Sequence, residues 1–168
     1  MKEEEKLKKI ARDYLVARKK FRDEADKIPE LFGNDNIIGR IGEFIALQFL
    51  EHELKRKRIN RNENMVQVGY DIMADNKMVS VKIITSENKK GNTTPIKDPW
   101  DELIIIELGE DSKINKIGFI TKDTFKKAIK DKFLTNNNPI ASRSMLKEGR
   151  LFNIYGKIFI SEDVKKYL

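Results

Sequence analysis

Apolar side chains recur at helical spacing through residues 2–28, while most of the positions between them are charged. This spacing predicts an amphipathic helix with one buried stripe. The segment PELFGNDN interrupts the pattern, and one of Asn34, Asp35 and Asn36 is the expected N-cap of the next helix. The apolar positions of the first helix are Leu7, Ile10, Tyr14, Val16, Ala17, Phe21, Ala25 and Ile28.

A second helix is expected at about residues 37–54, where the segment IIGRIGEFIALQFLEHEL is much more apolar than the first helix. Because apolar residues lie on most faces of this predicted helix, we expect it to be central in the fold. Residues 102–108 and 115–121 are predicted to be buried strands joined by a turn, and residues 122–133 a short helix. Polar loops are expected before and after this group, at residues 86–101 and 134–150.

The carboxyl-terminal segment RLFNIYGKIFI is predicted to form a strand or a hairpin, and SEDVKKYL a helix with Ser161 as its N-cap. The order of elements favours an α/β fold, with α+β as the alternative, around a mixed central sheet. A length of 168 residues suits one domain with a sizeable core. Its expected parts are an N-terminal charged helix and turn (1–33), a core (34–121) and C-terminal helix and strand additions (122–168).

The segment GYDIMADNKMVSVKIIT, residues 69–85, is predicted to be a β-hairpin with Asp75-Asn76 as its two-residue turn. This turn places Asp71 directly across from Ser80, and Lys82 two residues further along the same face. A carboxylate, a hydroxyl and an ammonium group are thus gathered on one face. The other face is expected to be the core, and it carries Ile72, Val79, Val81 and Ile83.

Two interpretations of this polar face remain open. It is either a structural cross-strand pair between Asp71 and Lys82, or a site that binds a metal ion and a phosphate. The basic run KRKRINRN at residues 55–62 has a similar ambiguity, since it fits a solvated edge strand as well as a track that faces phosphates.

Charge and composition narrow the range of functions. The chain has 34 basic and 27 acidic residues, a net charge of +7, which favours nucleic acid, an acidic membrane surface or an acidic protein as a partner. The absence of cysteine excludes disulfides, cysteine-ligated zinc and thiol catalysis. No apolar run approaches the roughly 20 residues of a membrane span, and the N-terminus lacks the apolar core of a signal peptide. We therefore expect a cytoplasmic protein with no membrane partner.

The motif GYDI followed by VSVK, and preceded by the helix GRIGEFIALQFLE, resembles the PD-(D/E)xK superfamily of nucleases. The resemblance covers about residues 37–108. It implies a restriction-endonuclease-like fold, with a mixed central sheet flanked by helices. It also implies a metal-dependent endodeoxyribonuclease, a hydrolase of DNA phosphodiester bonds of the restriction or DNA-processing type.

The resemblance also implies the roles of the site residues. Asp71 and Lys82 match the motif Asp and Lys, and Glu43 matches the carboxylate supplied by the preceding helix. Asp71, Glu43 and the carbonyl of Val81 would hold Mg²⁺, with Mn²⁺ as a substitute. Lys82 would act at the attacking water and the phosphate. The structural alternative for Glu43 is a local ion pair with Arg40.

One position departs from the family pattern. Ser80 stands where the family usually carries Glu or Gln, and we expect it to act as a hydrogen-bonding catalytic residue beside Lys82. Some branches of the family with a Ser-x-Lys motif recruit an acidic residue from a later helix. The later candidates here are Glu87, Asp98, Asp101 and Glu102, and spacing does not choose among them.

The implied partners are DNA and a second copy of the chain, because a twofold dimer is the natural way to cut both strands of a duplex. Lys89, Lys90 and Arg143 are candidate DNA contacts. One alternative is a DNA-binding or assembly protein of the same fold with impaired catalysis. Another is an unrelated α/β interaction domain in which Asp71 and Lys82 have only a structural role.

Overall fold

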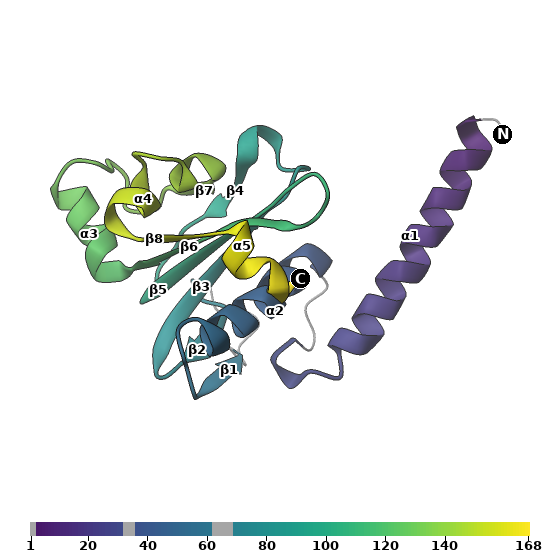
Figure 1. The fold of residues 1–168 in the computed structure, drawn as a ribbon, viewed down its shortest axis with the longest axis horizontal. Coiled ribbons are helices and arrows are strands. Elements are labelled where there is room, and N and C mark those ends of the chain that lie inside the picture. Colours follow the sequence, from purple (N-terminus) through teal and green to yellow (C-terminus); the bar gives the residue numbers. More distant parts are fainter. Residues whose placement is uncertain (1–2, 32–35, 62–68) are drawn as a thin grey trace.

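The computed structural model describes residues 3–31, 36–61 and 69–168, and within them it contains five α-helices and eight strands (Figure 1). The α-helices are α1 (Glu3–Ala25), α2 (Ile37–His52), α3 (Lys122–Lys130), α4 (Leu151–Tyr155) and α5 (Ser161–Val164). The strands are β1 (Ile59–Arg61), β2 (Ile72–Ala74), β3 (Lys77–Ile84), β4 (Asn92–Pro95), β5 (Glu102–Leu108), β6 (Ile114–Thr121), β7 (Ile140–Ser142) and β8 (Lys157–Ile160). Short 3₁₀ helices are η1 (Pro29–Leu31), η2 (Lys89–Gly91), η3 (Arg143–Leu146) and η4 (Lys165–Tyr167).

Six strands form one sheet in the order β1-β2-β3-β5-β6-β8, and β4 pairs with β7 in a separate two-stranded sheet. Within the six-stranded sheet only β3 and β5 are parallel, and the other neighbours are antiparallel. The chain is therefore a mixed α/β protein with a mostly antiparallel sheet flanked by helices. The predicted mixed sheet is confirmed at this level.

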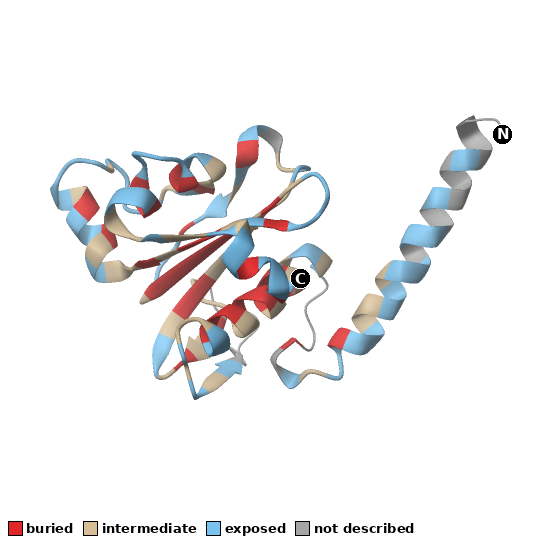
Figure 2. Cartoon of the chain, in the orientation of Figure 1, coloured by how far each residue is buried: buried red, intermediate tan, exposed pale blue. Residues whose placement is uncertain are grey.

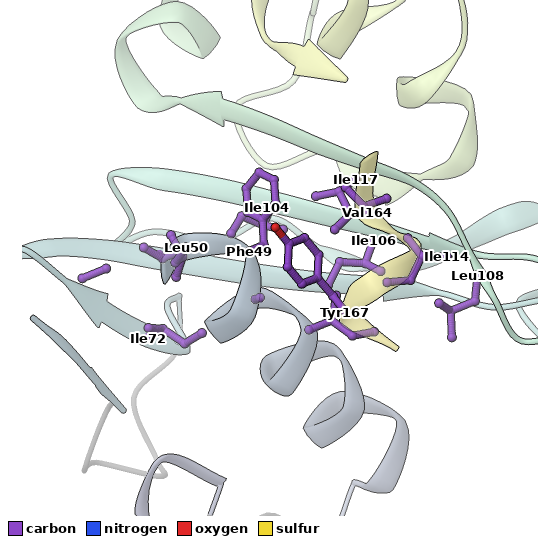
Figure 3. Close-up of a cluster of buried hydrophobic side chains, with 14 residues drawn as sticks. Phe49, Leu50, Ile72, Ile104, Ile106, Leu108, Ile114, Ile117, Val164 and Tyr167 are labelled. Carbon is purple, nitrogen blue, oxygen red and sulfur yellow. The ribbon is translucent and has the colours of Figure 1, made fainter. Parts of the chain in front are cut away.

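One face of the sheet is covered by α2, α5 and η4. Phe49 and Leu50 of α2 are fully buried there, together with Ile72 of β2 and Ile104 of β5 (Figure 3). Tyr167 of η4 closes the cluster from the carboxyl-terminal end. This explains why the α2 segment is apolar on most of its surface, because it lies between the sheet and other elements.

The other face of the sheet is also covered, by α3, α4 and η3. A second cluster of buried side chains lies there, and it includes Trp100, Phe125, Phe152 and the β5 residues Leu103 and Ile105. Since both faces are buried, β5 reads as a nearly continuous apolar run (ELIIIEL), and it lies at the centre of the buried region (Figure 2).

The first helix departs from its prediction. Helix α1 projects away from the sheet (Figure 1), and its apolar residues Ile10, Tyr14 and Val16 are 53%, 62% and 55% exposed. Of the α1 side chains that are described, only Ala25 is buried. The predicted buried stripe is therefore wrong for this part of the helix, because spacing shows that a face is apolar but not that anything packs on it. No helix in the described ranges is long and apolar enough to cross a membrane.

The prediction of the helix N-cap is confirmed at α2, where it named three candidate residues, and is wrong at α5. Asn36 is the N-cap of α2, and its side chain accepts a hydrogen bond from the Gly39 backbone N–H. Ser161, by contrast, is the first residue of α5 rather than its N-cap, since the extended residue before the helix is Ile160.

The segment before α5 contains a helix that was not expected. Residues 151–155 form α4 rather than a strand, and only residues 157–160 are extended. Leu151 and Phe152 are buried by this short helix against the second core cluster. The tertiary contact of these side chains overrides the β-propensity of the sequence.

Candidate functional site

A cavity lies at the edge of β3, beyond the point where β2 ends. Because β2 has only three residues, its ladder covers only the first residues of β3, and among the described residues no strand pairs with the second half of β3 on that side. The cavity has a volume of about 220 Å³. We call it the edge cavity. It is lined by Asn36, Gly39, Glu43, Asp71, Val81, Lys82, Ile83, Thr93 and Thr94.

The hairpin has the predicted register for three residue pairs, and it changes at Asp71. Ile72 pairs with Val79, as predicted from the Asp75-Asn76 turn. The ladder ends there, so Asp71 does not continue it opposite Ser80, and this part of the prediction is wrong. Instead, the Asp71 N–H donates to the Val79 carbonyl at 2.9 Å, and its Oδ2 accepts from the Val81 N–H at 2.6 Å.

This arrangement fixes the direction of a backbone carbonyl. Alternate residues of a strand direct their N–H and C=O groups to the same neighbouring strand. Since Val79 and Val81 both bond to Asp71, the Val81 carbonyl also points to this side of β3. It is directed beyond the end of β2, beside the carboxylate of Asp71 and toward the edge cavity.

Glu43 reaches the edge cavity from α2. The helix approaches β3 closely at Gly42, where an added Cβ would lie only 3.0 Å from Cβ of Ile83. The next residue, Glu43, is 7% exposed and lines the cavity. Arg40, the local partner considered for Glu43, has its guanidinium 2.7 Å from the carboxylate of Asp26. Carboxylates from a helix and from a strand end are therefore brought to one cavity.

Lys82 completes the group of charged side chains in the cavity. The pKa of Lys82 lies below its ordinary value of 10.5, mainly because burial disfavours the ammonium form. Asp71 opposes this shift by favouring the charged form, and nearby Lys97 adds to it by repulsion. A lysine with a lowered pKa is a better proton acceptor near neutral pH than an exposed one.

Ser80 lies outside the edge cavity. It is fully buried beside Leu103 of β5, on the face of the sheet that carries the second core cluster. Within the described part of the chain, its hydroxyl has no hydrogen-bond partner. The expectation of an open polar face was wrong here, because helices cover that face of the sheet as well.

The four later carboxylates lie outside the cavity too. Glu102 forms an ion pair with Arg56, Asp98 pairs with Lys122, and Asp101 accepts a hydrogen bond from the Met78 N–H. Glu87 is exposed in the turn after β3. None of these four is among the described residues that line the cavity. In the part of the chain that the structure describes, no three Asp, Glu or His side chains form a cluster that could hold a metal ion.

The oxygen donors of the cavity fit a hard divalent cation. Asp71 and Glu43 supply carboxylates, and the Val81 carbonyl supplies a neutral oxygen. Mg²⁺ typically takes one or two carboxylates from the protein and completes its coordination with water and phosphate oxygens. The donor set is therefore sufficient for Mg²⁺ or Mn²⁺ without a third carboxylate.

The three candidate DNA contacts have different settings. Lys89 and Lys90 belong to η2, next to the strand that contributes Thr93 and Thr94 to the cavity, and Lys90 is exposed. The guanidinium of Arg143 lies 2.9 Å from Glu107 and donates to the Thr85 carbonyl at 3.1 Å. Arg143 is thus held by partners inside the protein.

Sequence reasoning did not identify Thr93, Thr94 or the neighbour relation between Lys97 and Lys82. Thr93 and Thr94 belong to β4, and Lys97 belongs to the loop that follows. The sequence predicts only a polar loop for all three residues. The strand forms because β4 pairs with β7, which lies more than 40 residues later in the chain. The local hint of an extended segment was the pair of adjacent β-branched threonines, Thr93 and Thr94, before Pro95 and Ile96.

A comparison with models of protein families gave no match for this chain, and a search of curated proteins also gave none. The function is therefore inferred from the cavity residues and their geometry.

Proposed function

We propose that this chain is a metal-dependent endodeoxyribonuclease of the PD-(D/E)xK type, and that the edge cavity is its active site. The observation that carries the proposal is the meeting of Glu43, Asp71 and Lys82 in one cavity, with the Val81 carbonyl directed toward it. These residues come from a helix, a strand end and a central strand. A structural ion pair would need only Asp71 and Lys82, and it would not need a cavity.

The topology around the site is further support. The hairpin β2-β3 is followed by a strand, β5, that runs parallel to β3, and α2 packs across these strands. This order agrees with the mixed sheet that the restriction-endonuclease-like interpretation requires. The net charge of +7 favours a polyanionic substrate.

The proposed reaction is hydrolysis of a DNA phosphodiester bond. The oxygen of a water molecule forms a bond to phosphorus, and the bond from phosphorus to one sugar oxygen breaks. The water proton passes to the Lys82 amine, and the departing sugar oxygen takes a proton from solvent. Asp71, Glu43 and the Val81 carbonyl would hold the cation, which supplies positive charge beside the phosphate and makes nearby water more acidic.

Lys82 has a further task in this scheme. In its ammonium form it offsets the charge that gathers on the phosphate, and in its amine form it accepts the proton. Burial lowers the pKa of Lys82, which increases the share of the amine form relative to an exposed lysine. Thr93 and Thr94, which also line the edge cavity, would supply hydroxyl donors to the phosphate.

The experiment that tests this function is a cleavage assay on supercoiled, linear and branched DNA, with Mg²⁺, with Mn²⁺ and with a chelator. We expect metal-dependent cutting that is lost in Asp71→Asn. Cutting that survives both the chelator and Asp71→Asn would contradict the proposal. The three substrates also separate cutting at a duplex sequence from cutting at a branch or an end.

A second candidate function is a DNA-binding or assembly protein of this fold with impaired catalysis. The specific observation in its favour is the burial of Ser80, which leaves the usual acidic position of the motif outside the edge cavity. DNA binding at low salt with no cutting in either metal would support this function. Such binding should weaken steeply as the salt concentration rises. Binding releases cations from the DNA, and a high salt concentration makes this release less favourable.

A further inference from the structure

The apolar face of α1 continues from the body of the protein outward along the helix. Ile10, Tyr14, Ala17 and Phe21 alternate at spacings of three and four residues, and Ile28 continues the series beyond the helix. We call these five residues the α1 stripe. Ile10, Tyr14 and Ala17 are exposed, whereas Phe21 and Ile28 are half-buried near α2. Among the described residues, the stripe is therefore partly buried only at its inner end (Figure 2).

The inner end of the stripe borders an incompletely filled apolar region. Phe21 and Ile28 line a cavity of about 300 Å³ together with Ala25, Leu31 and Phe44 of α2. Ile28 and Phe44 also line a second cavity of about 320 Å³, where the apolar Leu47 and Ile59 are joined by the polar Gln48, Glu51, Arg56 and Lys57. The exposed apolar stripe is therefore continued at its inner end by one apolar hollow, the cavity of about 300 Å³.

We propose that a second copy of this chain docks its α1 antiparallel along the α1 stripe. Alternating spacings of three and four residues are typical of helices that pack side by side in pairs. In the antiparallel order, Ile10 of each copy lies beside Phe21 of the other, and the two Tyr14-Ala17 pairs lie at the centre. The outward half of each helix then covers the inner half of the other, next to the apolar hollow.

Charge complementarity points to a second copy as the occupant. Asp13 and Lys20 lie seven residues apart and flank the α1 stripe on the same side. An antiparallel pair brings Asp13 of each copy next to Lys20 of the other, which gives two ion pairs, each between an acidic and a basic side chain. A parallel pair would instead bring Asp13 next to Arg18, and it would pair the exposed outer halves of the two helices only with each other.

The first test measures the oligomeric state of the full chain by sedimentation or light scattering over a range of concentrations. We expect a dimer for the wild type. Tyr14→Asp should weaken it by about a hundredfold or more in the dissociation constant, because a charge is buried at the centre of the pair. Circular dichroism of each variant shows whether the helix is retained.

Val16→Asp is the matched control. Val16 lies on the same helix and is 55% exposed, but it points away from the α1 stripe. The same substitution there should leave the dimer intact. A monomeric wild type, a dimer that survives Tyr14→Asp, or equal disruption by Val16→Asp would each overturn the proposal.

The second test determines the orientation of the two helices. The chain has no cysteine, so a pair of single-cysteine variants reports only the contact between copies. A mixture of Asp13→Cys and Lys20→Cys should cross-link on oxidation. Cross-linking of Asp13→Cys with Arg18→Cys instead would overturn the antiparallel order, and no cross-link in either mixture would overturn docking along the stripe. Neither test depends on nuclease activity, so both can fail or succeed independently of the proposed function.

Discussion

Two groups of buried charges lie on the same sheet, and they differ in what surrounds them. At the beginning of β5, Glu102 pairs directly with Arg56 at 2.5 Å. At the edge of β3, Lys82 lies beside Asp71 and Glu43 in a cavity. Burial shifts a pKa in both groups, upward for Glu102 and downward for Lys82.

The comparison shows that a shifted pKa alone does not identify a functional site. The largest influence on Glu102 is burial, which raises its pKa, and Arg56 acts in the opposite direction by charge and by hydrogen bonding. We call Glu102 and Arg56 the closed pair because they bond directly to each other; Arg56 also lines the second cavity, beside Leu47 and Ile59, but Glu102 does not. Lys82 is only partly buried, and it borders a cavity with oxygen donors; this difference is the reason why we propose a function for the Lys82 group and a structural role for the Glu102 pair.

The largest expected effect is that of Asp71→Asn on cleavage. Asparagine can still accept the hydrogen bond from the Val81 N–H, so the fold is retained while the negative charge is lost. We expect Mg²⁺-dependent cutting to fall about a thousandfold or more. The matched control is Glu102→Gln, which removes the charge from the closed pair and should leave cutting within about tenfold. Equal losses in both variants would erase the distinction between the two groups.

The second effect concerns stability at the closed pair. Arg56→Met leaves the buried Glu102 carboxylate without its partner, and the free energy of unfolding should fall by about 3 kcal/mol. Urea denaturation followed by circular dichroism measures the change. The control is Lys113→Met, which breaks the exposed pair with Asp111 and should leave the free energy of unfolding nearly unchanged. An Arg56→Met protein as stable as the wild type would show that the pair is dispensable.

The third prediction concerns pH and Lys82. Because the pKa of Lys82 is lowered on folding, the unfolded chain binds more protons than the folded one between the folded pKa and 10.5. The stability contributed by this group therefore rises with pH across that interval. Lys82→Met should be more stable than the wild type at neutral pH, and its advantage should shrink as pH approaches 10.5.

The same variant should lose cleavage, so stability and activity would change in opposite directions. Urea denaturation at neutral and alkaline pH measures the first quantity. Lys97→Met provides the control, since Lys97 is exposed and its removal should raise the pKa of Lys82 without exposing any core. The pH at which cleavage reaches half its maximum should then move upward. A midpoint unchanged by Lys97→Met would argue against Lys82 as the proton acceptor.

The smallest expected effect is that of Ser80→Ala. Among the described residues the buried hydroxyl has no hydrogen-bond partner, so its removal should change the free energy of unfolding by less than about 1 kcal/mol. Cleavage should stay within about tenfold of the wild type. Ser80→Glu should be strongly destabilising, because it places a carboxylate beside Leu103 in the core. A loss of cleavage in a stably folded Ser80→Ala protein would indicate that Ser80 contributes to the active site.

The sequence predicted those parts of the fold that depend on local patterns. The Asp75-Asn76 turn set the register of the hairpin, and Asn36 marked the beginning of α2, because both signals act within four residues. The position of Glu43 near Asp71 could be anticipated only through the family resemblance. Contact between a helix and a strand depends on packing, and here it depends on the absence of a side chain at Gly42.

The sequence could not predict features that depend on distant parts of the chain. Whether the Ser80 face is open or covered is decided by α3, α4 and η3, which follow it by 40 residues or more. The exposure of the α1 stripe has the same origin, since an apolar spacing does not specify its partner. The pairing of β4 with β7 likewise joins two segments that each look like a polar loop.

The short length of β2 has a consequence for how the protein behaves in concentrated solution. A strand edge with open backbone groups is a template on which strands of other molecules can add, and such addition leads to aggregation. Among the described residues, no strand pairs with the second half of β3 on the β2 side; there the carboxylate of Asp71 accepts a hydrogen bond from the Val81 N–H, and Lys82 places a charge at the same edge. The proposed chemistry and protection against aggregation would therefore use the same two side chains, and a variant that loses both charges would lose solubility together with activity.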